Sequence, residues 1–302
     1  MKAALLREVD GPFEVVDVPD PEAGDRVLVR VRAAGINFAD VLMRRGRYPQ
    51  MPELPAVLGS EIAGELEDGT RVMAITSGGG GYAELAAVDR AQVVPLPDNA
   101  TFAEGASFLL TFLTAYVPLT RQVRLRPGMS ILIYAAAGGV GTATIQVARS
   151  LGAKVYGAVG SPEKLDVVRS LGAEAFTYDE IPDDLQVDVV FDPVGGELFA
   201  GAFARLRPLG SVIAIGSAAG AWPVVDPARL VGRSVGLHGF YLGRMLRLNP
   251  ELIGTGVGEL LGLWQAGSFR PVVGAELPLG EIERAHELVE SRKSVGKVVL
   301  IP

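Results

Sequence analysis

The segment spanning residues 130–151 constrains the fold more than any other part of this sequence. It contains an apolar strand (SILIYA, residues 130–135), a turn of small residues (AAAGGVG, residues 135–141) and an amphipathic helix that ends before Gly152. A continuous apolar strand is typical of the centre of a parallel sheet that is covered on both faces. The segment therefore predicts a strand–turn–helix unit of a dinucleotide-binding domain. A tight strand-to-helix turn without a ligand is the plainer alternative.

The turn fits the dinucleotide fingerprint, with Ala136 in the first glycine place, Gly138 in the second and Gly141 in the third. Gly138 lets backbone N–H groups approach a pyrophosphate at the start of the helix, where unpaired donors carry partial positive charge. Gly141 lets the helix pack closely on the strand. We therefore expect the cofactor to bind along this turn, at Ala137, Gly138, Gly139, Val140 and Gly141.

The end of the following strand indicates which dinucleotide is bound. An enzyme selective for NAD needs an acidic residue about 20 positions after the motif to hold the ribose 2′-hydroxyl. This region has no carboxylate, and Ser161 and Lys164 lie where a 2′-phosphate would arrive. Tyr178, after the third strand, is expected beside the adenine. The pattern favours NADPH, although Ser161 as a simple helix cap and Lys164 as a solvated lysine are the alternatives.

The rest of the chain divides into two patterns. Up to about residue 97 the strands are short and alternate apolar with polar residues, which is typical of an antiparallel region, interrupted by one helix near residues 38–45. From about residue 111 strands alternate with helices, and six such strands predict a doubly wound α/β domain. After residue 244 follow two helical patterns and a last strand at residues 297–301, and periodicity alone does not assign this tail to either region.

Composition excludes several classes of site. The 302 residues include 0 Cys, so disulfides, cysteine nucleophiles and thiolate metal sites are absent. The only histidines are His238 and His286, and both are expected to be structural. A formal net charge of -7 disfavours general binding of nucleic acid. Acidic residues interrupt the N-terminal apolar stretch, so we expect a cytoplasmic protein with no signal peptide and no membrane association.

Six motifs occur in an order that resembles the zinc-independent quinone oxidoreductases, the zeta-crystallin-like branch of the medium-chain dehydrogenase/reductase superfamily. They are GINFADVLMRRGRYP (residues 35–49), LGSEIAG (58–64), AAAGGVG (135–141), GSPEK (160–164), LGA (171–173) and GKVVLIP (296–302). The resemblance implies a GroES-like β-barrel catalytic domain made of residues 1–110 and 245–302. It implies an inserted Rossmann NADPH-binding domain at residues 111–244, with a doubly wound parallel sheet.

Differences from the zinc alcohol dehydrogenases of that superfamily indicate whether this protein binds a metal. Asn37 and Ser60 stand where those enzymes have a zinc cysteine and a zinc histidine, so no metal site is expected. The resemblance implies Asn37 and Tyr48 as catalytic residues that donate hydrogen bonds to a carbonyl oxygen. A turn residue and a rim aromatic are the plainer interpretations of these two. Asp40 and Glu61 are equally well explained by buried structural hydrogen bonds or a helix cap.

The resemblance also implies further cofactor contacts from residues distant in sequence. Phe240, at the end of the last strand of the doubly wound region, is expected to line the nicotinamide, and the contacts that the resemblance implies are Gly216, Ser217, Arg292 and Lys297. Solvated basic side chains are the alternative interpretation of the last two.

Together these features predict an NADPH-dependent quinone oxidoreductase. A 2-alkenal or enoyl thioester reductase would use the same cofactor and the same candidate proton donor, and a non-catalytic NADPH-binding protein with a structural or RNA-binding role is the alternative from another class. The apolar strand at residues 235–240 predicts an open sheet edge through which two copies form a homodimer. The sequence does not identify the physiological quinone or enone.

Overall fold

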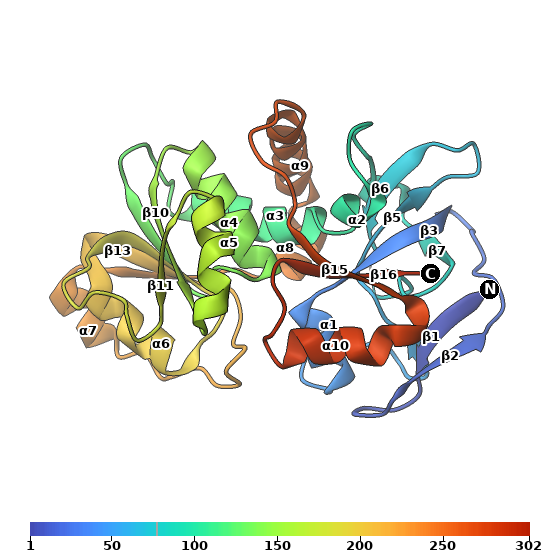
Figure 1. Cartoon of the computed structure of the whole chain (residues 1–302), viewed down its shortest axis with the longest axis horizontal. Coiled ribbons are helices and arrows are strands. Elements are labelled where there is room, and N and C mark those ends of the chain that lie inside the picture. The colour runs from blue at the N-terminus through green and yellow to red at the C-terminus, as the bar shows by residue number, and fades with distance from the viewer. Residues whose placement is uncertain (77) are drawn as a thin grey trace. The chain divides into compact units, whose positions relative to one another are not determined.

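The computed structural model describes residues 1–76 and 78–302 and contains two compact units (Figure 1). Both ends of the chain form the first unit, Met1–Leu110 with Pro271–Pro302, and Thr111–Arg270 forms the second. The first boundary lies where the sequence suggests, but the chain returns to the first unit after Arg270 rather than after residue 244.

The later boundary has a physical cause in helix α9 (Pro250–Gln265). Its Glu259 Oε2 accepts hydrogen bonds from the Tyr116 hydroxyl at 3.0 Å and from Arg121 at 2.8 Å, both in the second unit. Leu113 lies against Gly256 of the same helix. Because these contacts tie α9 to the second unit, only the chain after Arg270 joins the first.

The first unit is built on a seven-stranded sheet. The order is β15-β16-β3-β5-β6-β8, and β7 also pairs with β3. A three-stranded antiparallel sheet with order β2-β1-β4 accompanies it. The strands are β1 (Lys2–Leu6), β2 (Phe13–Asp17), β3 (Val27–Ile36), β4 (Ala56–Val57), β5 (Glu61–Glu65), β6 (Arg71–Ile75), β7 (Leu85–Val88), β8 (Val93–Pro95), β15 (Val273–Pro278) and β16 (Lys297–Ile301).

Strand β3 shows why this sequence forms a half-buried sheet. Val29 and Val31 are buried, while the alternating Arg30 and Arg32 face solvent, as a period of two requires. The buried side chains of this and neighbouring strands form one core with helix α10 (Ile282–Glu290). His286 of α10 is buried against that core, with its ring 4.6 Å from the ring of Phe13.

The C-terminal strand β16 lies beside β3, which is far away in the sequence; in Figure 1 the two are red and blue. Val298 pairs with Ile36 and Val299 with Gly35 in antiparallel register. Continuing this register by one residue sets Lys297 opposite Asn37. The sequence did not indicate the neighbouring strand β15, whereas the assignment of the last strand to the first unit, implied by the resemblance, agrees with its place in the structure.

The second unit is a six-stranded parallel sheet with order β11-β10-β9-β12-β13-β14. In chain order this is 3-2-1-4-5-6, the doubly wound arrangement in which ligands bind beyond the carboxyl ends of the strands. Figure 1 shows α4 and α5 on one face of this sheet and α6 and α7 on the other. The strands are β9 (Ser130–Ile133), β10 (Lys154–Val159), β11 (Glu174–Thr177), β12 (Val187–Asp192), β13 (Leu206–Ala214) and β14 (Gly236–Gly239).

The helix near residues 38–45 and the helix after the glycine turn lie where the sequence predicts them, with ends that differ by one or two residues. Those of the first unit are α1 (Phe38–Arg44), α2 (Phe102–Gly105) and α10, with the 3-10 turns η1 (Arg90–Gln92) and η5 (Leu279–Glu281). α3 (Leu109–Val117) begins at the unit boundary. The second unit has the π-helical turn η2 (Pro118–Gln122), α4 (Gly139–Ser150), η3 (Pro162–Lys164), α5 (Leu165–Ser170), α6 (Gly196–Ala202), η4 (Phe203–Arg205), α7 (Pro227–Arg233), α8 (Leu242–Leu248) and α9.

One helical stretch of the described residues, Phe102–Gln122, is long and apolar enough to cross a membrane by length and composition. Its most apolar window is 83% buried inside the structure. A core helix has these properties, so the stretch is weak evidence for a membrane span.

Candidate functional site

The first candidate site is organised around Asn37, which lies between the end of β3 and the start of α1. The Asn37 backbone N–H donates to Asp40 Oδ2 at 2.7 Å, and the Asp40 N–H donates to the Asn37 carbonyl at 3.0 Å. Asp40 Oδ1 also accepts from the Ser60 hydroxyl at 2.9 Å. Asp40 is fully buried. These bonds fix the backbone of Asn37 at the helix start, as a capping carboxylate does.

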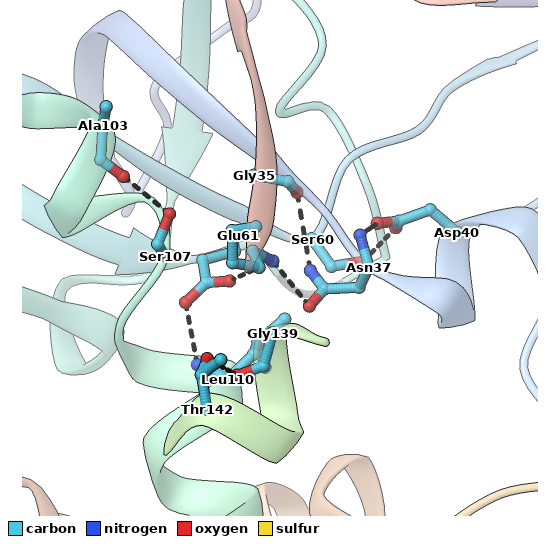
Figure 2. A network of polar contacts seen from close by, with 11 residues as sticks. Gly35, Asn37, Asp40, Ser60, Glu61, Ala103, Ser107, Leu110, Gly139 and Thr142 are labelled. Atoms are coloured by element: carbon cyan, nitrogen blue, oxygen red, sulfur yellow. Dashed lines mark hydrogen bonds and ion pairs between the residues drawn. The ribbon is translucent and has the colours of Figure 1, made fainter. Parts of the chain in front are cut away.

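The side chain of Asn37 meets an ion pair formed between two strands, β16 and β5 (Figure 2). Lys297 Nζ, from β16, donates to Asn37 Oδ1 at 2.8 Å and to Glu61 Oε2, from β5, at 3.0 Å. Glu61 Oε1 accepts from the Leu110 N–H at 2.9 Å. We call Asn37, Glu61 and Lys297 the amide–ion-pair network.

The two charged members of this network are shielded from water. Glu61 is 0% and Lys297 4% exposed, whereas Asn37 is half-buried. Burial raises the pKa of Glu61, and the charge of Lys297 and the Leu110 N–H act in the opposite direction. Burial raises the pKa of Asp40 in the same way, against its hydrogen bonds to Asn37 and Ser60. Each buried carboxyl group therefore depends on the donors around it to remain ionised.

A zinc ion does not fit the side chains at this place. Zinc takes thiolate, imidazole or carboxylate ligands, whereas Asn37 and Ser60 offer an amide and a hydroxyl. The nearby carboxylate of Glu61 already binds the ammonium group of Lys297, which would repel a metal cation. Across residues 1–76 and 78–302, no group of three or more histidine, cysteine, aspartate or glutamate side chains could hold a metal.

Two other predicted residues of the first unit, Tyr48 and Arg292, lie in the loops that follow α1 and α10. Tyr48 is half-buried in a bend after α1. Arg292 is exposed after α10, with a positive φ of 59°. The alternative interpretation of Lys297 as a solvated side chain is wrong, because Lys297 is buried and its ammonium group binds Asn37 and Glu61.

The second candidate site is the turn between β9 and α4. A Cβ atom on Gly141 would lie 2.2 Å from the Ala135 carbonyl oxygen and 2.7 Å from Ala136 Cα, so only glycine fits there. A Cβ on Gly138 would meet only the Ala135 oxygen, at 3.4 Å, which is ordinary contact. Gly138 precedes the first residue of the twelve-residue helix α4, and no side chain caps it. The helix start thus offers backbone N–H groups, which favour an anion such as a phosphate.

The residues predicted near an adenosine phosphate lie at the ends of β10 and β11. The Ala135 N–H donates to the Tyr178 hydroxyl at 3.2 Å, which ties Tyr178 to the glycine turn. Tyr178 also borders Gly160, whose Cβ would lie 3.6 Å from its ring. Ser161 precedes the 3-10 turn η3 and Lys164 ends it, both half-buried. Burial lowers the pKa of Lys164. The structure therefore gathers these residues beside the carboxyl end of the sheet.

The remaining predicted cofactor residues follow the last two strands of the sheet. Gly216 and Ser217 come after β13, and the Ser217 hydroxyl is buried without a hydrogen-bond partner among the described residues. Phe240 follows β14 and is 8% exposed. Parallel strands carry their carboxyl ends to one edge, so these residues share an edge with the glycine turn.

The sequence leaves the role of Glu61 open and indicates Lys297 as a cofactor contact, whereas the structure places both in the network around Asn37. Their positions are 236 residues apart in the chain. The usable signal was the motif GSE, which places a carboxyl group beside the residue that replaces a zinc histidine. The motif does not indicate that Glu61 pairs with Lys297, because only the pairing of β16 with β3 brings the two side chains together.

Comparison with known proteins agrees with this architecture. Residues 23–98 match the family description "Alcohol dehydrogenase GroES-like domain", and residues 165–300 match "Zinc-binding dehydrogenase". The GroES-like and Rossmann-like fold class predicted from the sequence is thereby confirmed. The second description names a metal that the side chains around Asn37 do not fit.

Two relatives and one solved structure show the breadth of the similarity. The quinone oxidoreductase of Pseudomonas aeruginosa is 35% identical, over 96% of this chain and 95% of that protein. The synaptic vesicle membrane protein VAT-1 homolog of Rattus norvegicus is 32% identical, over 94% of this chain and 79% of that protein. The quinone oxidoreductase of Thermus thermophilus, solved alone and in complex with NADPH, is 39% identical, with a TM-score of 0.91 and full coverage of both chains. The chain belongs to the quinone oxidoreductase branch of the medium-chain dehydrogenase/reductase superfamily.

Proposed function

We propose that this protein is an NADPH-dependent reductase of quinones or similar conjugated carbonyl compounds and that it works without zinc. The reaction class rests on the side chains around Asn37, because they can donate hydrogen bonds to a carbonyl oxygen but cannot ligate a metal. The relatives named quinone oxidoreductase and the NADPH complex of the Thermus thermophilus protein support the same proposal.

The residues of the second unit fit a bound NADPH. The backbone from Ala137 to Gly141 would hold the pyrophosphate, while Ser161, Lys164 and Tyr178 would hold the adenosine end with its 2′-phosphate. When bound, NADPH supplies the hydride for the carbonyl compound. Gly216, Ser217 and Phe240 at the ends of the last strands complete the proposed cofactor site, and Arg292 of the first unit is a further proposed contact.

The chemistry required of the first unit is modest. Reduction of a quinone places negative charge on a carbonyl oxygen, and N–H or O–H donors stabilise that charge. Asn37 would donate through Nδ2 and Tyr48 through its hydroxyl. A proton from the solvent completes the hydroquinone, so that a quinone, one NADPH and one proton give a hydroquinone and NADP⁺.

Selectivity for NADPH tests the cofactor assignment. Lys164→Met should weaken NADPH binding by about tenfold, since one charge-assisted bond is lost, and should leave NADH binding unchanged. Fluorescence titration with both nucleotides measures this. Lys293→Met removes an exposed lysine of the first unit and serves as the matched control. Tighter binding of NADH than of NADPH by the unaltered protein would contradict the assignment.

Substrate class is tested by steady-state assays of the protein with benzoquinones, 2-alkenals and an enoyl thioester. We expect quinones to give the largest kcat/KM. An enone preferred by orders of magnitude would identify the protein as a 2-alkenal or enoyl thioester reductase, for which the same donors serve. NADPH binding without turnover of any of these compounds would indicate a non-catalytic NADPH-binding protein.

We also propose that two copies form a homodimer through the edge of the parallel sheet. β14 ends the strand order, and two apolar residues whose backbones bind Ser234, shortly before β14, are exposed: Leu209 of β13 is 87% and Val231 of α7 is 79% exposed. An open strand edge next to exposed apolar side chains is suited to pairing between copies. Sedimentation at micromolar concentration should give twice the chain mass of 31.7 kDa, and the chain mass alone would contradict the proposal. A cytoplasmic location and the lack of a nucleic-acid partner stay predictions, which cell fractionation and binding titrations would test.

A further inference from the structure

We propose that Lys297 is a positioning residue: it locks the side-chain amide of Asn37 so that the NH₂ group, and not the oxygen, is offered to the substrate. This inference rests on the proposed function, in which Asn37 donates to a carbonyl oxygen. It assigns Lys297 to the chemistry of the first unit and not to the cofactor.

The direction of the Asn37 amide follows from the chemistry of its partner. An ammonium group has three donors and no acceptor, so the atom 2.8 Å from Lys297 Nζ must be the amide oxygen. The amide nitrogen is consequently the atom turned away from Lys297. Nδ2 donates to the Gly35 carbonyl over a long 3.4 Å, and a hydrogen bond from the Asn37 side chain also lowers the pKa of Glu61, so a substrate oxygen would take over one of these two donor hydrogens. With the amide reversed, its oxygen would face the oxygen of the substrate and repel it.

Lys297 can do this because it is itself held in place. Glu61 Oε2 accepts its second bond at 3.0 Å, and the Leu110 N–H fixes the other oxygen of Glu61. A Cβ on Gly35 would lie 3.0 Å from Lys297 Cε and 1.9 Å from the Ala106 carbonyl oxygen. The lysine side chain is therefore confined on one side by backbone and on the other by its ion pair.

Asn37 has a second restraint that does not depend on Lys297. Its backbone N–H is bound by Asp40, and the helix start is fixed by that bond. Loss of Lys297 should leave the backbone of Asn37 in place and free only the rotation of its amide. The two effects are thus separable by experiment.

The first experiment observes the amide directly and needs no activity. Asparagine occurs only at positions 37, 99 and 249, so asparagine-selective ¹⁵N labelling gives three side-chain NH₂ pairs in an NMR spectrum. The pair missing from Asn37→Ala identifies Asn37. We expect Lys297→Met to shift this pair and accelerate its hydrogen exchange, and Lys293→Met to leave it unchanged. A pair that is the same in Lys297→Met and in the unaltered protein would overturn the proposal.

The second experiment is a double-mutant cycle on kcat for benzoquinone at saturating NADPH. We expect Lys297→Met to lower kcat by about 10- to 100-fold, because a misplaced reacting group slows the chemical step on that order. Asn37→Ala should lower kcat at least as far, and Asn37→Ala/Lys297→Met should equal Asn37→Ala. If the losses of kcat in the two single variants multiply in the double variant, Lys297 acts independently of Asn37, for instance on the cofactor, and the proposal is overturned.

A charge-neutral variant separates positioning from folding. Lys297→Met alone leaves Glu61 buried without its counter-charge, so the variant can fail to fold. Lys297→Met/Glu61→Met removes both charges, and we expect it to fold, to bind NADPH as the unaltered protein does and to keep the low kcat. Recovery of kcat in this variant would show a merely structural role and overturn the proposal. Absence of quinone reduction by the unaltered protein would instead contradict the proposed function, while the NMR result would still decide how Asn37 is held.

Discussion

The two units carry their functional groups in different ways. In the first unit the candidate site is made of side chains. Lys297 and Glu61 are buried together as an ion pair, and Asn37, which precedes α1, binds Lys297 through its amide oxygen. In the second unit it is made mainly of backbone, with small residues leaving the N–H groups of α4 accessible. A buried charge network is sensitive to any loss of charge, whereas a backbone turn is sensitive to added volume.

Because of this difference, a substitution of a given kind should change the stability of the two units by different amounts. Removing a charge should cost stability in the first unit, and adding a methyl group should cost it in the second.

The largest effect is expected from Lys297→Met, which leaves Glu61 buried without a partner. The free energy of unfolding should fall by about 3–5 kcal/mol, the usual result of breaking a buried pair by removing one member. Urea unfolding at neutral pH measures it. Lys297→Met/Glu61→Met should recover most of the loss, because no charge is then left unpaired. Equal losses in the single and double variants would show that packing, and not charge, stabilises the site.

In the second unit Gly141→Ala should lower the free energy of unfolding by about 1–3 kcal/mol, since its methyl group overlaps the Ala135 carbonyl oxygen. Gly138→Ala is the matched control for volume, because its Cβ meets that oxygen only at 3.4 Å. It should unfold at the same urea concentration as the unaltered protein. Fluorescence titration should nevertheless show weaker NADPH binding, because the methyl group covers the start of α4. Equal stability of the two variants would refute the close packing of this turn.

His286 tests the buried polar character of the first unit through pH. Burial, with the positive charges of Arg44 and Arg45, lowers its pKa to about 3, and both ring nitrogens lack hydrogen-bond partners among the described residues. The unfolded chain, with a histidine pKa of about 6.5, binds a proton that the folded one does not. This contribution to stability is therefore complete above about pH 6.5 and is lost as the pH falls toward 3.

Between neutral pH and about pH 5 the free energy of unfolding should consequently fall by about 2 kcal/mol from His286 alone. Urea titrations at both pH values measure it. His286→Leu should lack this part of the pH dependence. If the variant and the unaltered protein lose the same stability on acidification, the histidine is not kept neutral by the core.

The smallest effects should be the same in the two units, because they concern half-buried or exposed helix starts. Thr101 Oγ1 accepts from the Glu104 N–H at 3.2 Å in the first unit, and Asp226 Oδ1 from the Ala228 N–H at 2.9 Å in the second. Thr101→Ala and Asp226→Ala should each cost about 1 kcal/mol. Thermal unfolding compares them. A much larger loss in one unit would mean that the units differ beyond their candidate sites.

What the sequence predicts well is local. The strand, turn and helix around Gly138 and Gly141 follow one another within some twenty residues, and each carries its own signal in apolar runs and small side chains. The parallel sheet and most helices follow from the same periodicity. The return of the chain at Arg270 was not visible, because the contacts of α9 with α3 join residues more than a hundred positions apart.

The role of Lys297 in the candidate site is not predictable from the sequence. A lysine near the end of a chain is most often solvated, and no local pattern distinguishes this one. Its environment arises from the register of β16 on β3, which sets it opposite Asn37, and from Glu61 on the adjacent strand. Such a network depends on tertiary pairing, whereas the glycine turn depends on sequence neighbours.

We propose that the first unit supplies the hydrogen-bond donors for the reaction and that the second unit binds NADPH. One stopped-flow series tests this most directly. NADPH binding and the single-turnover rate of its oxidation by benzoquinone are followed for Asn37→Ala and Lys164→Met. We predict that Asn37→Ala lowers the rate on the order of 100-fold with an unchanged Kd for NADPH. Lys164→Met should weaken binding and keep the rate at saturation. An unchanged rate in Asn37→Ala, or a loss of NADPH binding in it as large as in Lys164→Met, would contradict the account.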